Sequence, residues 1–244
     1  MRLDKFLADS GKGSRKDVKD IIRSGRVAVN GAPVKDPGTA ISDSDSVLLD
    51  GEVISYSKYA YFMMNKPAGV ITATEDRHQS TVLDLIKAPV PKGLSPVGRL
   101  DKDTVGLLLL TNDGELNHRL LSPKGHVPKK YFARLSPDAD RLRLDESDIA
   151  AFSDGIKLAD MTCMPAKLSI LSDLEAEVVI VEGKFHQVKR MFSSRGFSVV
   201  FLKRTSMGPL VLDPALPEGS YRPLSEDEIR SLSTYTIRPE QEAF

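Results

Sequence analysis

The chain has 244 residues, of which 41% are hydrophobic and 28% charged, and a single cysteine, Cys163. These proportions are ordinary for a globular protein, and the length allows one large domain or two unequal ones. One cysteine excludes an internal disulfide and four-cysteine zinc or iron–sulfur sites, which fits a reducing cytoplasm. The chain contains no run of about 18 apolar residues, so we expect no membrane span, and its charged start predicts no signal peptide.

Charge is unevenly distributed along the chain. The 34 basic and 34 acidic residues give a formal net charge of zero. Residues 1–35 nevertheless carry nine basic and four acidic side chains, whereas residues 36–52 carry five acidic and no basic ones. The total charge therefore gives no reason to expect nucleic-acid binding. The basic start is a local patch that either faces solvent, as most charged runs do, or neutralises phosphates.

Two short helices are predicted at the start of the chain. Leu3, Phe6 and Leu7 have the spacing of one helical face over residues 2–8. Ser14 is placed to cap a second helix that runs to about residue 24, and Gly25 ends it. Lys16, Lys19 and Arg23 would share one exposed face of this second helix.

Two hairpins follow the helices. Asn30-Gly31 and Asp50-Gly51 each predict a tight turn between two short strands. The polar stretch Ser55–Lys58 is the expected linker to the rest of the chain. We therefore predict a small helix-helix-hairpin domain over residues 1–57 and a larger domain over residues 58–244.

Three motifs in this first module resemble the S4 RNA-binding domain. They are Arg2-Leu-Asp-Lys-Phe-Leu, Ser14-Arg-Lys and Arg26-Val-Ala-Val-Asn-Gly. Lysine and arginine on a rigid helical face can neutralise phosphates without reading base sequence. The resemblance implies that the module contacts RNA through Arg2, Lys5, Arg15, Lys16, Lys19, Arg23 and Arg26.

The larger domain mixes strands and helices. Gly106 leads into the apolar run Leu107 to Leu110, which predicts a buried strand. Ser225 and Glu228 form a capping box for a last helix that ends near residue 233. We expect further strands over residues 61–64, 129–135, 178–181 and 201–204, and further helices over residues 81–87, 114–121 and 186–195.

Asp101 and Asp103 lie in the loop before the buried strand, and their spacing alone fits several chemistries. The glycines of this loop are not those of a phosphate-binding P-loop, because no Gly-Lys-Ser/Thr ends it. A metal pair, a glycosidase carboxylate pair and plain turn-forming aspartates all remain open. His78, His118 and His126 have no metal-ligand spacing.

A second basic patch lies near the end of the chain. Between Glu182 and Asp213 there are six basic residues and no acidic ones. These are Lys184, Lys189, Arg190, Arg195, Lys203 and Arg204. His186 at the start of the predicted helix is interpreted as a packing or hydrogen-bonding residue rather than a base, and Cys163 as a buried thiol.

Ordered motifs along the whole chain resemble the RsuA-type pseudouridine synthases. They are Gly98-Arg-Leu-Asp101, Lys130-Tyr131, Glu182–Phe192, Arg204 through Gly208-Pro209, and Gly219–Ser225. The resemblance implies an α+β fold, in which an S4 domain precedes a catalytic domain with a central, mostly antiparallel sheet. It also implies an isomerase that converts a uridine of ribosomal RNA into pseudouridine.

The resemblance assigns roles to particular side chains. Asp101 matches the catalytic aspartate, which acts at the ribose as nucleophile or base. Tyr131 matches the active-site tyrosine, and Lys189 matches the basic residue that pairs with the aspartate. Arg99 would place the flipped nucleotide, and Lys184, Arg190 and Arg204 would join it in contacting RNA. Leu210 would help close the pocket. No metal and no cofactor is expected, because the reaction is an isomerisation.

The short, clean ends favour small-subunit 16S ribosomal RNA, or the assembling small subunit, as the partner. Position 516 of that RNA is the target that the resemblance implies. Alternatives are a large-subunit enzyme and a non-catalytic S4 protein that assists ribosome assembly. An RNA methyltransferase is disfavoured, since Cys163 lacks polar or basic neighbours and no glycine-rich cofactor loop is visible. We expect a cytoplasmic monomer that does not contact membranes.

Overall fold

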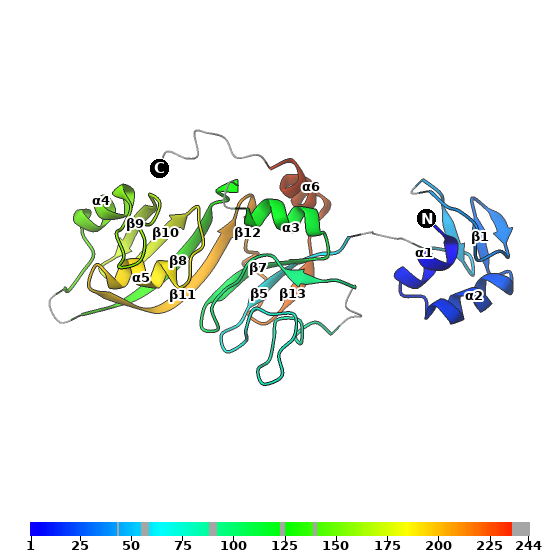
Figure 1. Ribbon diagram of the computed structural model, residues 1–244, viewed down its shortest axis with the longest axis horizontal. Helices are drawn as coiled ribbons and strands as arrows, with labels where there is room; N and C mark the ends of the chain where they lie inside the picture. The colour runs from blue at the N-terminus through cyan, green and yellow to red at the C-terminus, as the bar shows by residue number, and fades with distance from the viewer. Residues whose placement is uncertain (43, 55–58, 88–91, 123–124, 139–140, 236–244) are drawn as a thin grey trace. The chain divides into compact units, whose positions relative to one another are not determined.

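The structure is a computed structural model that describes residues 1–42, 44–54, 59–87, 92–122, 125–138 and 141–235 (Figure 1). The chain divides into two compact units, Met1–Tyr59 and Ala60–Phe244. The hydrophobic core of the first unit contains only residues of that unit, and the same holds for the two cores of the second. The predicted linker Ser55–Lys58, and with it the predicted boundary after residue 57, lies outside the described residues.

The first unit contains two helices and four short strands. They are α1 (Leu3–Asp9), α2 (Arg15–Arg23), β1 (Val27–Val29), β2 (Ala32–Val34), β3 (Val47–Leu49) and β4 (Glu52–Val53). The predicted cap of α2 is confirmed: the Ser14 hydroxyl accepts a hydrogen bond from the Asp17 amide, and the Asp17 carboxylate accepts one from the Ser14 amide. Both predicted hairpins are confirmed as well.

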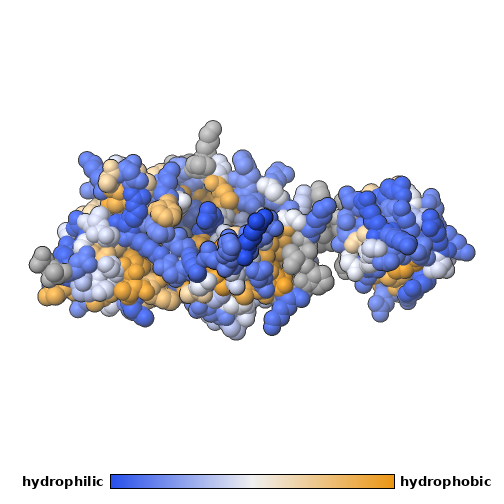
Figure 2. Space-filling view, turned by 60° about the horizontal axis from the view of Figure 1, so that its bottom comes forward, coloured by the Kyte–Doolittle hydropathy of each residue, from blue (hydrophilic) through white to orange (hydrophobic). Residues whose placement is uncertain are grey.

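The two hairpins form one antiparallel sheet in the order β2-β1-β3-β4. Asn30 and Asp50 adopt φ of 51° and 52° at the hairpin turns, a conformation that these residue types tolerate. The helices pack on this sheet through a core that includes Leu3, Leu7 and Ile22. In the view of Figure 2, most of the surface of this unit is hydrophilic.

The second unit contains four helices and nine strands among its described residues. The helices are α3 (Gly114–Leu121), α4 (Glu146–Asp154), α5 (Gln187–Ser193) and α6 (Glu226–Thr234). The strands are β5 (Tyr61–Lys66), β6 (Ser95–Pro96), β7 (Val105–Thr111), β8 (Lys129–Pro137), β9 (Lys167–Ser172), β10 (Glu175–Ile180), β11 (Phe197–Met207), β12 (Leu210–Val211) and β13 (Tyr221–Pro223).

These strands form one mixed sheet in the order β13-β5-β7-β11-β8-β10-β9. Outside this order, β6 pairs with β7 and β12 pairs with β11. The pairing of β7 with β11 is parallel, and the other strand pairings given for this sheet are antiparallel. The predicted α+β class with a mostly antiparallel sheet is therefore confirmed.

Helices cover the sheet on different sides. Leu107 and Leu109 pack into a core with α3 and α6, whereas Leu108 and Leu110 face a larger core that includes residues of α4 and α5. This explains the unbroken apolar run of β7, because a strand that is buried on both faces has no solvent-facing positions for polar residues. Figure 1 shows α4 and α5 against the half of the sheet that contains β8, β9, β10 and β11.

Two local predictions differ from the structure. The segment Thr81–Lys87 was expected to be a helix, but it forms consecutive turns, with Asp84 accepting hydrogen bonds from the Thr81 amide and hydroxyl. The helix α4 was not predicted, although Asp145 and Asp148 form a capping box at its start. Asp148 is completely buried there and is bonded by the guanidinium groups of Arg141 and Arg195.

Candidate active site

The loop that carries Asp101 is fixed by a buried lysine. Lys66 ends β5, and its ammonium donates hydrogen bonds to the backbone carbonyls of Pro67 (2.9 Å), Thr104 (2.9 Å) and Lys102 (3.3 Å). Burial lowers the pKa of Lys66 to about 8, against the opposing attraction of nearby carboxylates that include Asp101. The bonds to Lys102 and Thr104 hold the backbone that follows Asp101 in place.

Two further contacts complete this loop. The Thr72 hydroxyl donates to the Leu100 carbonyl at 2.8 Å, and it accepts from the Leu100 amide at 3.2 Å. After the loop, Gly106 has a φ of 101°, and a Cβ at this position would lie 2.3 Å from the Arg204 carbonyl oxygen. Only glycine therefore allows β7 and β11 to approach closely enough for their parallel pairing.

The first turn of α5 supplies the cationic partner of Asp101, Lys189. Gln187 is buried, and its amide side chain donates to Glu182 and accepts from the Lys184 amide, which folds residues 182–187 into a compact loop. His186 precedes the helix with a φ of 50°, in the left-handed region. Lys189, in the first turn of α5, reaches the Asp101 loop from this position.

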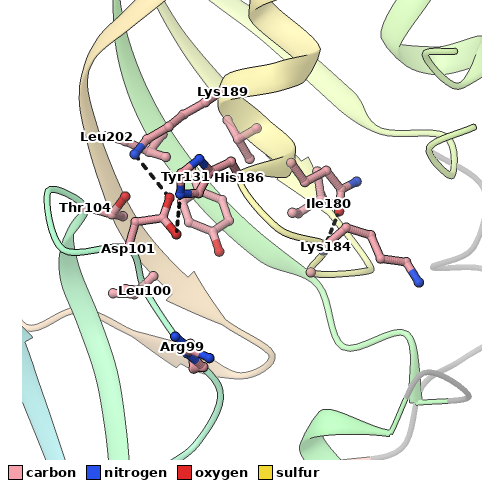
Figure 3. Close-up of a pocket in the computed structure, with 13 residues that line it drawn as sticks. Arg99, Leu100, Asp101, Thr104, Tyr131, Ile180, Lys184, His186, Lys189 and Leu202 are labelled. Atoms are coloured by element: carbon pink, nitrogen blue, oxygen red, sulfur yellow. Dashed lines mark hydrogen bonds and ion pairs between the residues drawn. The ribbon is translucent and has the colours of Figure 1, made fainter. Parts of the chain in front are cut away.

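Lys189 joins two carboxylates. Its ammonium lies 3.1 Å from Asp101 Oδ2 and 2.5 Å from Asp103 Oδ1 (Figure 3 shows the pair with Asp101). Partial burial favours the neutral amine, but the hydrogen bonds with Asp103 and Asp101 outweigh it and raise the pKa of Lys189. The same contact holds the pKa of Asp103 below its ordinary value. The predicted pairing of Lys189 with Asp101 is present, and Asp103 is an addition to it.

Asp101 and Tyr131 face the same open pocket of about 420 Å³. Tyr131 projects from β8 and is only 7% exposed, so its ring forms a deep part of the wall (Figure 3). Apolar wall residues are Leu100, Ile180, Val188 and Leu202. Leu210 is buried in the core beside α6 and does not line the pocket.

His186 lies beside Asp101 at the same pocket. Its Nε2 is 3.6 Å from Asp101 Oδ1, which is longer than a normal hydrogen bond, and its ring stacks on that of Phe185. Figure 3 shows the imidazole between Lys189 and Tyr131, with Nε2 directed at the carboxylate.

The cations predicted to bind RNA in this unit separate into three groups. Arg99 and Lys184 are exposed and line the pocket, as Figure 3 shows. Arg190 lies on α5 and forms an ion pair with Asp160. Arg204 was predicted to contact RNA, but it is 2% exposed, and its Nε donates to the Leu107 carbonyl at 2.7 Å. Arg204 therefore supports the β7–β11 junction from inside and presents no surface to a phosphate.

The predicted RNA-binding residues of the first unit are mostly on its surface. Lys5, Arg15 and Lys16 are exposed, and Lys19 is half-buried. Three other exposed arginines are each paired with an acid: Arg2 with Asp4, Arg23 with Asp20, and Arg26 with Asp50.

Sequence reasoning missed Lys66, Thr72 and Gln187. A visible signal existed for Lys66, which is a charged residue at the end of an apolar strand, directly before Pro67. Such a residue is buried only when its charge is hydrogen-bonded. Thr72 offered no comparable signal, because its partner is the backbone of Leu100, which only the fold brings near. The partners of Gln187, Glu182 and Lys184, are close in sequence, but their residue types do not by themselves indicate a buried side chain.

Among the described residues, no group of three histidine, cysteine, aspartate or glutamate side chains could hold a metal ion. In the same part of the chain, no helix is both long enough and apolar enough to cross a membrane.

Comparisons with known proteins agree with this architecture. Residues 60–194 match the family model of RNA pseudouridylate synthases, and residues 1–47 match that of the S4 domain. An uncharacterized RNA pseudouridine synthase of Bacillus subtilis is 46% identical, over 96% of this chain and 98% of its own. The ribosomal small subunit pseudouridine synthase A of Haemophilus influenzae is 40% identical, over 95% and 99%.

A solved structure supports the same fold. The crystal structure of a pseudouridylate synthase is 40% identical, covers 95% of this chain and 99% of its own, and superposes with a TM-score of 0.67. The family match and these relatives show an enzyme that isomerises uridine in RNA. The protein belongs to the RNA pseudouridine synthase family.

Proposed function

We propose that this protein converts a uridine of small-subunit 16S ribosomal RNA into pseudouridine, with Asp101 as the group that acts at the ribose. The observation that carries the proposal is the Asp101 carboxylate, 29% exposed, facing a pocket that Tyr131 also lines and held by Lys189 at 3.1 Å. The small-subunit target is supported by the 40% identity to the Haemophilus influenzae enzyme over almost the whole chain.

The reaction breaks the bond between N1 of uracil and C1′ of ribose and forms a bond between C5 and C1′. The proton on C5 is lost and N1 gains one, so the atoms balance without a co-reactant. A carboxylate suits the first step because it can attack, or stabilise positive charge at, C1′, or take a proton from the ribose. Lys189 contributes by fixing the orientation of the Asp101 carboxylate.

The remaining pocket residues suit a flipped nucleotide. The target base must leave its stack to reach Asp101, and the ring of Tyr131 offers a face for it to stack on. The Tyr131 hydroxyl is the group available to assist removal of the C5 proton. The exposed guanidinium of Arg99 is suited to the phosphate of the same nucleotide.

The wider assignment follows from the same proposal. The first unit supplies exposed cations for ribosomal RNA, either free or in the assembling small subunit. A single chain provides Asp101, Lys189 and Tyr131 at the pocket, which is consistent with action as a monomer. The enzyme would work in the cytoplasm, where bacterial ribosomes assemble.

The test is to map pseudouridines in both ribosomal RNAs from cells without the gene and from cells that carry Asp101→Asn. Asparagine keeps the size of the side chain and cannot act as nucleophile or base. We expect one small-subunit pseudouridine, at the implied position 516, to disappear in both strains. Loss of a large-subunit pseudouridine instead would contradict the target, and an unchanged map in the gene deletion would favour a non-catalytic role.

Purified Asp101→Asn protein provides the control. Its thermal stability and RNA affinity should match those of the wild type, because affinity comes mainly from cations on phosphates. Pseudouridine formation by this folded, RNA-binding variant would disprove the role of Asp101.

A further inference from the structure

Phe185 is an exposed aromatic side chain between two residues that line the active-site pocket, Lys184 and His186. It is 75% exposed, although burial of a phenylalanine is normally favourable. It lies in the loop between β10 and α5, one residue before His186. The buried side chain of Gln187, two residues after Phe185, bonds Glu182 and the Lys184 amide before it, so Phe185 is presented by a fixed backbone.

His186 backs the Phe185 ring. The two ring centroids are 3.8 Å apart, and the planes are inclined by 16°, so the rings are stacked. The left-handed backbone of His186, at a φ of 50°, is costly for a residue with a side chain, and such conformations gather at functional sites. With one face of Phe185 against the imidazole and the side chain three-quarters exposed, its other face is open.

The position of the pair relative to the pocket decides what can occupy this open face. His186 lines the pocket that contains Asp101, whereas Phe185 is not among the residues that line it. The target uracil must enter the pocket to bring its C1′ to Asp101, so it does not reach the outer face of Phe185. A base on that face belongs to a different nucleotide.

The charges nearby suit a nucleic-acid strand. Lys184, directly before Phe185, is exposed and lines the pocket edge, and Arg99 is exposed elsewhere on the same pocket. Figure 3 shows the side chain of Lys184 extending away from Asp101. An aromatic face flanked by cations is the arrangement with which proteins hold unpaired nucleotides, the cations on phosphates and the ring on a base.

We propose that Phe185, supported by His186, is the stacking platform for the base of a nucleotide adjacent to the flipped uridine. The platform replaces part of the stacking that the strand loses when the uridine turns into the pocket. It also requires this neighbour to be unpaired, which makes Phe185 a determinant of the RNA structure that the enzyme accepts. The proposal rests on the uridine-flipping reaction of the proposed function.

The test uses full-length protein and short single-stranded RNAs with one central uridine and 2-aminopurine on its 5′ or its 3′ side. Stacking quenches 2-aminopurine fluorescence, so binding to wild type should quench the probe at one of the two positions. Phe185→Ala should abolish this quenching and weaken affinity about 5- to 150-fold, the range for loss of one aromatic–base stack. Phe185→Trp should retain both.

Leu142→Ala is the matched control, because Leu142 is 81% exposed and does not line the pocket. It should bind RNA as the wild type does. The salt dependence of binding should be the same in Phe185→Ala and wild type, because no phosphate contact is removed. Thermal unfolding of each variant separates loss of stacking from loss of fold.

Two outcomes would overturn the proposal. One is an affinity of Phe185→Ala equal to that of Leu142→Ala, and the other is quenching by Phe185→Ala as strong as that by the wild type, or wild-type quenching at neither position. The assay reads binding to a short RNA and does not depend on which ribosomal RNA is modified. A failure of the small-subunit target would therefore leave its result valid.

Discussion

In the first unit the predicted RNA-binding cations lie on the surface, whereas in the second unit Lys66, Lys189 and Arg204 are turned toward the protein. Lys5, Arg15 and Lys16 are exposed and free to exchange water for phosphate. Lys66 and Arg204 are buried and bonded to backbone carbonyls, and Lys189 is bonded to two carboxylates. These basic residues thus lie exposed on the surface in the first unit, whereas in the second unit they hold parts of the candidate active site and of the sheet beside it.

The physical reason is the cost of removing a charge from water. A surface cation keeps its hydration and needs no fixed partner, so its position can vary. A buried cation is tolerated only where partners are placed around it, and it then fixes those partners in turn. The inward cations should therefore govern turnover and stability, and the outward ones RNA affinity and its dependence on salt.

The largest effect should come from Lys189. Lys189→Met removes the charge that orients Asp101 and leaves Asp101 and Asp103 without their common partner. We expect turnover to fall by about 10²–10³-fold, as for loss of one preorganised electrostatic contact, with RNA affinity nearly unchanged. Single-turnover pseudouridine formation at saturating enzyme measures this. Lys189→Arg should restore part of the rate, and a fully active Lys189→Met would show that the pairing is dispensable.

Lys66 should give the folded state a distinctive pH dependence. Its pKa of about 8 in the folded protein lies below the ordinary value of 10.5. Between these two pH values the unfolded chain keeps a proton that the folded chain has lost, so the free energy of unfolding rises with pH. The rise should reach about 3 kcal/mol relative to Lys66→Met, which lacks the group. Denaturant unfolding at pH 7, 8.5 and 10 measures it, and parallel curves for both proteins would refute it.

Arg204 and Lys184 should respond in opposite ways. Arg204→Met leaves the Leu107 carbonyl without its donor and should lower the free energy of unfolding by about 1–3 kcal/mol. Lys184→Met should leave that free energy within about 0.5 kcal/mol and reduce the salt slope of RNA binding by about 1. Thermal unfolding and binding at several salt concentrations measure the pair. If Arg204→Met were as stable as the wild type and had a reduced salt slope, Arg204 would contact phosphate after all, and the interpretation of its burial would be wrong.

The smallest effects on turnover should come from residues of the first unit. Replacing Lys5, Arg15 and Lys16 together by glutamine should reduce the salt slope of RNA binding by up to about 3, and leave turnover at saturating RNA unchanged. The matched triple variant replaces the acid-paired Arg2, Arg23 and Arg26 by glutamine as well, so that it removes the same total charge. It should reduce the slope less, because part of each arginine's charge is already neutralised. Equal slopes for both variants would show that pairing has no influence.

Local signals predicted most of the elements correctly. Ser14 with Asp17, the Asn30-Gly31 turn and the capping box of Ser225 and Glu228 each contain their partners within a few residues. The helix expected over Thr81–Lys87 failed because an aspartate three residues after Thr81 satisfies a tight turn equally well.

The candidate site was predictable in its motif residues but not in its supports. Asp101 and Lys189 were recognised by family resemblance, and the structure brings them together across 88 positions of sequence. The burial of Arg204 could not be predicted, because it results from the close approach of β11 to Gly106. An arginine near the end of a strand has the same charge and spacing whether its side chain is exposed or buried. Only the position of the neighbouring strand determines which of the two it is.

The parallel contact between β7 and β11 also sets an order of events during synthesis. Val105 and Gly106 pair with Lys203 and Arg204, so β7, which has β5 on its other side, gains its neighbour β11 only after almost a hundred further residues are made. The first unit needs only residues up to Ile54 for its core and can fold early. A nascent chain would therefore fold its first unit, the S4 domain, well before it has a working catalytic centre. A truncated product that ends before β11 would bind RNA without modifying it.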